Sequence, residues 1–170
     1  MSLFARILVP VDGSAQSRRA IDLALDVAQA VGSQLCFVNV VDRSRISVEC
    51  SNVPFADPTP LLEQATADAE DILAQAAACA TAVGLSARTT LSEGAPVDAI
   101  CKLAHDEGSE LIVMGSHGRR GFDRFVVGST TEGVMRASSV PVLVVRVAKD
   151  TAKVVRSRTL PSTPLHDTLA

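Results

Sequence analysis

The chain has 170 residues, of which 47% are hydrophobic and 3% aromatic, and its formal net charge is −3. This length is typical of one domain that buries about 70% of the surface of its unfolded chain, which excludes a disordered body. The strongly apolar runs are no longer than strands, which excludes a membrane span. The N-terminus lacks a basic region followed by an apolar stretch, so no secretory signal is expected. We therefore expect a cytoplasmic protein with an aliphatic interior.

Hydrophobic periodicity predicts a strand at residues 5–11, followed by a helix with Ser14 as its N-cap. The apolar residues of that helix recur on one face, and Gly32 ends it. A second strand follows at residues 34–41. The segment from Asp42 to Asp57 shows no clear periodicity and is longer than most connections. We expect it to form a lid or binding loop, or a surface insertion.

The second half of the chain continues the alternation of strands and helices. Pro60 suits the first turn of a long alanine-rich helix that ends at Gly84. A strand at residues 85–91, a third helix and a strand at residues 111–114 follow, and Pro141 precedes a fifth strand. This order predicts βαβ units and an α/β fold with a parallel sheet. Ligands bind such sheets outside the carboxyl ends of the strands, where the strand order reverses.

A glycine-punctuated loop follows the fourth strand. It begins with Gly115-Ser116-His117-Gly118 and, nine residues later, reaches Gly128-Ser129-Thr130. The run Ser129-Thr130-Thr131-Glu132 has the form of a capping box, which predicts a helix that starts directly after Gly128 with Ser129 as its cap. The free N–H groups and the positive dipole end of that helix then point into the loop. Glycines at both ends allow a positive φ and a close approach to an anion.

Charge in the loop supports an anionic ligand. Arg119, Arg120 and Arg124 outnumber the single Asp123, in a chain that is acidic as a whole. Glycine loops and capping boxes also occur in α/β proteins that bind nothing at this position, so a purely structural role stays open. The chain contains neither the G-x-x-x-x-G-K-S/T nor the G-x-G-x-x-G phosphate motif.

Taken together, these motifs resemble the universal stress protein family. The opening strand and turn, the end of the second strand, and the fourth strand with its loop carry the resemblance, which covers roughly residues 4–147: Arg6-Ile7-Leu8-Val9-Pro10-Val11-Asp12-Gly13-Ser14, Val40-Val41-Asp42, and Leu111-Ile112-Val113-Met114-Gly115-Ser116-His117-Gly118-Arg119. The spacing G-x2-G-x9-G-S matches that of the family's ATP-binding members. The resemblance implies a Rossmann-like, doubly wound sheet of five parallel strands in the order 3-2-1-4-5, with helices on both faces. It implies a domain at residues 1–147 and a polar tail at 148–170.

The resemblance also implies a ligand, which is ATP, ADP or AMP, with or without Mg²⁺. An adenine and ribose pocket would be lined by Pro10, Val11, Val40 and Met114. The phosphates would be held by Gly115, Gly118, Gly128, Ser129 and Thr130, with His117 and Arg119 beside them. Asp12 would approach the ribose or a phosphate-bound metal, and this role is favoured over its alternative, an Asx turn into the first helix.

The implied function is a nucleotide-dependent switch in the stress response. Catalysis has little support, because hydrolysis needs a positioned base and phosphoryl transfer usually recruits a lysine, and the motif contains none. A slow ATPase and a nucleotide-independent interaction dimer remain as alternatives. A KH-type nucleic-acid module, suggested by Gly118-Arg119-Arg120-Gly121, fits poorly with an acidic body that has few aromatic residues.

The last expected strand begins at Val142, ends at Val147 and lacks a polar face. At a sheet edge such a strand invites a partner, so we expect a homodimer through it, as the family resemblance also implies, besides an unknown protein partner. The tail beyond it carries a local charge of +2. It is expected to be a flexible appendage or a segment laid across the partner subunit.

The four cysteines and three histidines show no metal-binding spacing. Cys36 falls in a strand and Cys79 and Cys101 on helices, which predicts small buried residues. Cys50 lies in the long segment after the second strand and is the one thiol expected to be exposed. His105 lies near a helix end, where a cation suits the dipole.

Overall fold

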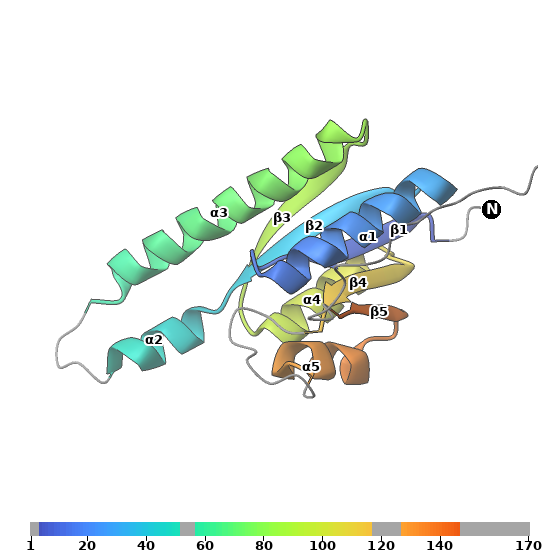
Figure 1. Cartoon of the computed structure of the whole chain (residues 1–170). Helices are drawn as coiled ribbons and strands as arrows, with labels where there is room; N and C mark the ends of the chain where they lie inside the picture. Colours follow the sequence, from blue (N-terminus) through green and yellow to red (C-terminus); the bar gives the residue numbers. More distant parts are fainter. Residues whose placement is uncertain (1–3, 52–56, 117–126, 147–170) are drawn as a thin grey trace, which may run out of the picture.

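The structure, a computed structural model, describes residues 4–51, 57–116 and 127–146. The tail at 148–170, together with Val147, lies outside this part of the chain. Within the described residues, strands and helices alternate as Figure 1 shows. The strands are β1 (Arg6–Pro10), β2 (Gln34–Val41), β3 (Ala87–Glu93), β4 (Leu111–Gly115) and β5 (Val142–Val145). The helices are α1 (Ala15–Val31), α2 (Arg43–Ser51), α3 (Thr59–Ala82), α4 (Pro96–Asp106) and α5 (Ser129–Ala137).

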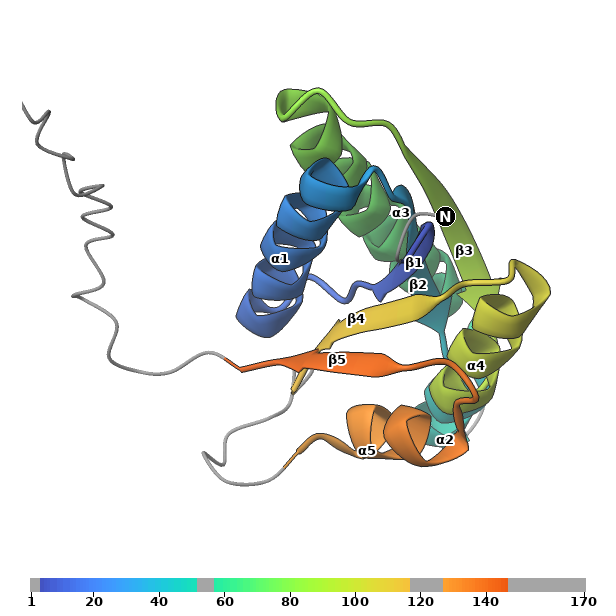
Figure 2. The same cartoon turned by 90° about the vertical axis from the view of Figure 1, so that its right-hand side faces the viewer.

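The five strands form one parallel sheet in the order β3-β2-β1-β4-β5, as the sequence and its family resemblance predict. Helices α1 and α3 cover one face of this sheet, and α4 and α5 cover the other, which Figure 2 shows from the side of the sheet. The strand order reverses between β1 and β4, because the chain winds outward from β1 in both directions. The carboxyl ends of β1 and β4 therefore border the crevice where such sheets bind ligands.

Alternating side chains of the strands form a core on each face of the sheet. Ile7, Val9 and Phe37 pack with α1 and α3, whereas Leu8 and Ile112 pack with α4 and α5. All five are 1% exposed or less. The aliphatic interior expected from the composition is confirmed, and it fixes the strand ends that border the crevice.

Several helix boundaries follow from local chemistry. The N–H of Ser17 donates to Ser14 Oγ over 3.1 Å, which confirms Ser14 as the cap of α1, and Gly32 ends the helix with a left-handed φ of 75°. Pro60 lies in the first turn of α3, as predicted. The third strand begins two residues later than predicted, at Ala87.

The prediction of an irregular segment from Asp42 to Asp57 is wrong for its first part, where α2 forms. The carboxylate of Asp42 accepts from the N–H of Arg45 over 3.1 Å and so caps this helix. Helix α2 lacks an apolar face, which explains why periodicity does not reveal it. Residues 52–56 lie outside the described part of the chain.

The cysteine predictions hold in part. Cys36 is buried, as expected, but Cys79 is exposed and Cys101 is half-buried. The buried residues of α3 are Ala69, Leu73, Ala76 and Ala80, and Cys79 falls outside that stripe. Cys50 belongs to α2 and not to a loop. Among the described residues, no helix combines the length and apolar character that a bilayer span needs.

Candidate functional site

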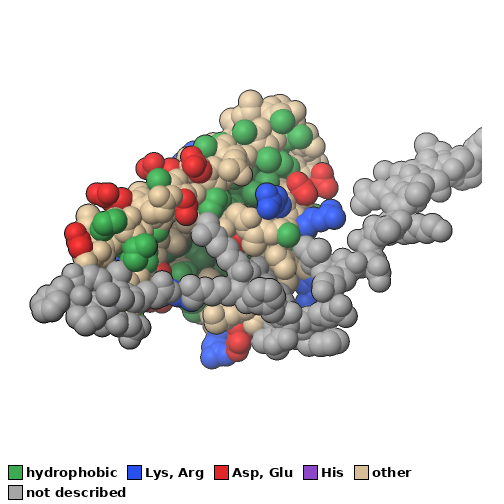
Figure 3. Space-filling view, turned by 60° about the vertical axis from the view of Figure 1, so that its left-hand side comes forward, with side chains coloured by type: hydrophobic (Ala, Val, Ile, Leu, Met, Phe, Trp, Pro, Cys, Tyr) green, Lys and Arg blue, Asp and Glu red, His purple; other side chains and the backbone are tan. Residues whose placement is uncertain are grey.

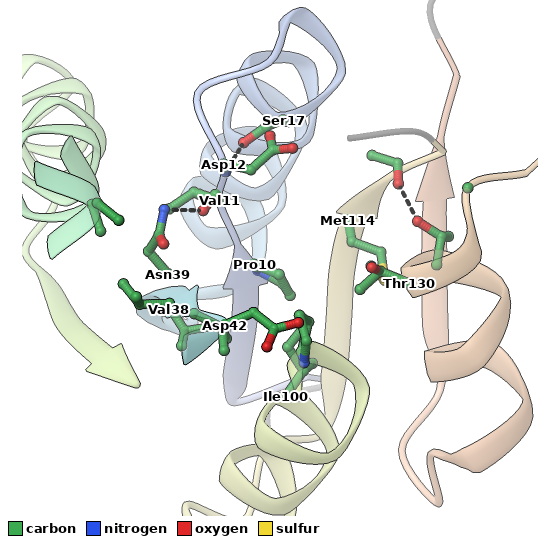
Figure 4. A pocket seen from close by; sticks show the side chains of 18 of the residues that line it. Pro10, Val11, Asp12, Ser17, Val38, Asn39, Asp42, Ile100, Met114 and Thr130 are labelled. Atoms are coloured by element: carbon green, nitrogen blue, oxygen red, sulfur yellow. Dashed lines mark hydrogen bonds between the residues drawn. The ribbon is translucent and has the colours of Figure 1, made fainter. Parts of the chain in front are cut away.

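A cavity of about 560 Å³ opens at the carboxyl ends of β1, β2 and β4, within the size range of ligand sites. Figure 4 shows side chains from these strands facing α4 and α5 across it, and Figure 3 shows the molecule hollowed, with apolar side chains inside. The structure brings nine of the twelve residues named from the sequence to its wall: Pro10, Val11, Asp12, Val40, Met114, Gly115, Gly128, Ser129 and Thr130. His117, Gly118 and Arg119 lie outside the described residues.

The turn after β1 holds Asp12 at the cavity by two hydrogen bonds. Its Oδ1 accepts from the N–H of Ser14 over 3.0 Å, so the Asx turn considered from the sequence is present. Its own N–H donates to the buried hydroxyl of Ser17 over 3.2 Å. Gly13 between them has a φ of 79°, which a residue with a Cβ rarely adopts. The turn thus fixes a carboxylate at the edge of the cavity.

Asn39 is a lining residue that sequence reasoning missed. It lies in β2 on the face that packs against α1 and α3, and its side chain is 8% exposed. Its Nδ2 donates to the carbonyl oxygen of Val11 over 2.8 Å, and the N–H of Val11 donates to Val38 O over 2.8 Å. Both the N–H and the carbonyl group of Val11 are therefore bonded to β2. The register of β1 against β2 reveals this pairing, and no motif in the sequence does.

The N-terminus of α5 forms another side of the cavity. The predicted helix start directly after Gly128 is confirmed, but the predicted capping box is wrong. Gly128 is itself the N-cap, no side chain caps the helix, and Ser129 is its first residue. The φ of Gly128 is −62°, so the expected positive φ is also wrong at this end of the loop. The N–H of Gly128 donates to Ser116 O over 2.8 Å, which closes the loop on the end of β4.

The missing cap leaves donors at the start of α5. The amides of Ser129, Thr130 and Thr131 have no acceptor in the part of the chain that the structure describes. Ser129 is exposed and Thr130 half-buried, and both line the cavity. Three free N–H groups at the positive end of a helix dipole are a site for an anion.

Gly115 serves packing as well as the cavity. A Cβ on this residue would lie 2.8 Å from Gln16 Cβ and 2.9 Å from the backbone carbon of Gln16. The end of β4 therefore lies against the first turn of α1, too close for any side chain. Gly115 does not have a positive φ, so glycine is needed at this position for lack of space and not for its backbone conformation.

The described wall of the cavity is acidic. It carries the carboxyl groups of Asp12, Asp42 and Asp68 against the guanidinium of Arg45. Hydrogen bonds from the Ser44 hydroxyl and the Arg45 N–H, together with the Arg45 charge, lower the pKa of Asp42, so this carboxyl is ionised at neutral pH. Within the described ranges, no three His, Cys, Asp or Glu side chains gather as a metal site.

Comparisons with known proteins agree with this architecture. A model of the universal stress protein family matches residues 3–146. A Staphylococcus epidermidis protein named for the same family is 36% identical over 149 residues, which cover 86% of each chain. The solved structure of the protein MJ0577 has a TM-score of 0.76 and 28% identity, and the match covers 87% of this chain and 99% of that one. A universal stress protein solved in complex with cAMP has a TM-score of 0.61 and 27% identity, with 85% and 98% covered.

Proposed function

This chain belongs to the universal stress protein family, and we propose that its cavity binds an adenine nucleotide, ATP, ADP or AMP, as a regulatory switch in the stress response. One observation carries the proposal: an uncapped helix N-terminus faces a cavity at the switch point of a doubly wound sheet. A similar protein was solved with cAMP, which is also an adenine nucleotide.

The phosphates bind at the start of α5. The amides of Ser129, Thr130 and Thr131 donate to phosphate oxygens, and the hydroxyls of Ser129 and Thr130 add two further donors. The N–H of Gly128 donates to Ser116 O, so the two ends of the glycine loop meet beside this anion site. His117, Gly118 and Arg119 belong to this loop in the sequence, and the family resemblance implies that they also contact the phosphates.

The base and ribose bind toward β1 and β2. Pro10, Val11, Val40 and Met114 supply apolar contacts with the faces of the base, and Asp12 lies where a ribose hydroxyl would donate to it. Apolar walls with a few placed polar groups are the usual composition of a small-molecule site. The pocket therefore suits a flat heterocycle joined to an anion.

Mg²⁺ accompanies a di- or triphosphate in this site. The described wall is acidic, so a bare polyphosphate would be repelled by Asp12 and Asp42. A divalent cation bound to the phosphates would remove that repulsion, and Asp12 is the residue that would help to hold it. The loop after β4 also contains Arg119, Arg120 and Arg124.

The site is built for binding and not for rapid turnover. Asp12 accepts an N–H bond within its turn, which holds its carboxylate in place as a ligand group. The nucleotide therefore acts as a signal read through α2, whose Arg45 and Ile46 line the same cavity.

The signalling unit is a homodimer. Strand β5 stands at the edge of the sheet, and its Leu143 is 38% exposed. An apolar edge strand pairs readily with a second copy of itself. Pairing through β5 would link two cavities, because β5 neighbours β4, whose end borders each cavity.

Calorimetric titration with ATP, ADP and AMP, with and without Mg²⁺, tests the proposal. Ser129→Pro removes one free amide at the first helical position, where proline is tolerated, and Ser129→Ala keeps the amide as a control. We expect at least tenfold weaker binding of ATP by Ser129→Pro and at most threefold by Ser129→Ala. Absence of binding by the unaltered protein contradicts the proposal, and ATP turnover at ordinary enzyme rates, about 1–10³ s⁻¹, contradicts its non-catalytic part.

A further inference from the structure

Asn39 is a nearly enclosed amide with a hydrogen bond on one side only. Its Nδ2 donates to Val11 O over 2.8 Å, as Figure 4 shows, and 8% of the residue is exposed. Because a carbonyl oxygen only accepts, this bond fixes which end of the amide is nitrogen. The other end is the acceptor Oδ1, and no group in residues 4–51, 57–116 or 127–146 donates to it.

The fold alone does not require an amide at this position. The same face of β2 carries Leu35, Phe37 and Val41, all buried and apolar. Holding the carbonyl of Val11 needs a donor, which Nδ2 supplies, and makes no use of Oδ1. A buried acceptor without a donor costs free energy, so its place in a cavity wall indicates a donor on the ligand.

The sheet order places Asn39 at the end of the cavity remote from α5. Asn39 lies on β2, the free amides of α5 lie beyond β4, and β1 runs between these strands. Neighbouring strands are about 4.8 Å apart, which separates β2 from β4 by roughly 10 Å. A nucleotide with its phosphates on α5 therefore extends its base toward β2.

We propose that Asn39 Oδ1 accepts a hydrogen bond from an exocyclic amino group of the base and so selects amino-substituted over keto-substituted purines. The inference rests on the proposed nucleotide function and adds the residue that chooses the base. A 6-amino group donates to Oδ1. A 6-keto oxygen would oppose it acceptor to acceptor and leave both groups unsatisfied.

The test compares ADP with inosine diphosphate, which has the same ribose and phosphates but a 6-keto group. Calorimetry on the unaltered protein is expected to show at least tenfold tighter binding of ADP. Asn39→Leu is close in volume but lacks both Oδ1 and the Nδ2 donor to Val11 O, and it is expected to bind the two within threefold of each other. Equal affinities in the unaltered protein overturn the inference without any variant, and so does a full ADP preference in Asn39→Leu.

A second variant guards against misfolding of the first. Asn39→Gln retains both an amide oxygen and an N–H donor for Val11 O, and is expected to keep the preference for ADP, with circular dichroism confirming its fold. A folded Asn39→Gln that binds both nucleotides equally overturns the inference. If the unaltered protein binds ADP and inosine diphosphate equally well, the proposed function stands and this inference fails. If it binds neither nucleotide, both the proposed function and this inference fail.

Discussion

The hydroxyl of Thr131 donates to the carbonyl oxygen of Gly115 over 2.8 Å, and this buried bond ties the first turn of α5 to the end of β4. The two residues border the loop of the glycine motif from opposite sides. The position of the free amides of α5 over the crevice therefore depends on this bond as well as on helix packing.

Replacing Thr131 with valine tests this tie. The change keeps the shape of the side chain but removes the buried donor, so we expect a loss of about 1–2 kcal/mol in the free energy of unfolding. Thr130→Val is the matched control: the hydroxyl of Thr130 is half-buried, faces the cavity and makes no bond to the described residues. Urea denaturation measures the free energy of unfolding of both variants. Equal values for the two would contradict the structural role of Thr131.

Gly115→Ala tests whether the first glycine of the motif serves packing. A methyl group would collide with Gln16, so we expect about 1–3 kcal/mol lower stability. Gly128→Ala is the control, because a φ of −62° is open to alanine, and its stability should change by less than about 0.5 kcal/mol. Thermal and denaturant unfolding measure the stability of both variants. A Gly115→Ala variant as stable as the unaltered protein would show that α1 can move away from β4 with no loss of stability.

Long periodic elements were predictable because each follows from one signal, as Ser14 caps α1 in the way its side chain predicts. The parallel sheet followed from the alternation of strands and helices, whereas its strand order was implied by the family resemblance. The capping box at Ser129 failed because the helix starts one residue early for it: Gly128 is the N-cap and Ser129 is already helical, while Glu132 pairs with Arg136. The residue at which α5 begins depends on where β4 ends, and the composition of the segment does not encode that.

Contacts between distant segments were not predictable. In the sequence Asn39 is a single polar residue within an apolar strand, and only the register of β1 against β2 shows that it lies beside Val11. Helix α2 depends on the Asp42 cap and not on an apolar stripe, so periodicity gives no signal for it. Cys79 lies in a helix with alanines on every face, so the sequence does not show which face of this helix packs against the core.

The Asp42 cap should make α2 sensitive to acid. The pKa of Asp42 is lowered in the folded state below its ordinary value of 3.8. The carboxylate therefore contributes stability above that value, and the contribution is lost as the pH falls through the lower folded-state pKa. The protection of the amides of residues 46–48, measured relative to the intrinsic exchange rate at each pH, should fall in acid, and Asp42→Ala should show the low protection already at pH 7. Protection in Asp42→Ala equal to that of the unaltered protein would exclude the cap.

Thiol reactivity should separate Cys79 from Cys36. Cys79 is exposed, whereas burial raises the pKa of Cys36 and disfavours its thiolate. At pH 8 we expect a maleimide to label Cys79 at least tenfold faster than Cys36, with the sites identified by mass spectrometry. Labelling of Cys36 at the rate of Cys79 would mean that β2 opens readily. Cys79→Ser serves as the control that removes the fast site.

Leu143→Arg tests the proposed dimer. A charge on the exposed face of β5 opposes its own copy across a two-fold axis, so we expect a monomer in analytical ultracentrifugation at micromolar concentration. Met135→Arg alters another exposed apolar residue, on α5, and should leave the dimer intact. A monomeric unaltered protein would contradict pairing through β5.

The most direct test of the account follows the backbone amide resonances of Ser129, Thr130 and Thr131 while Mg²⁺ and ADP are added to isotope-labelled protein. The account predicts that these three amides, with those of Val11 and Asp12, shift most and saturate together. Saturable binding that leaves the three α5 amides unshifted, or no response at all, would contradict a phosphate site at the N-terminus of α5.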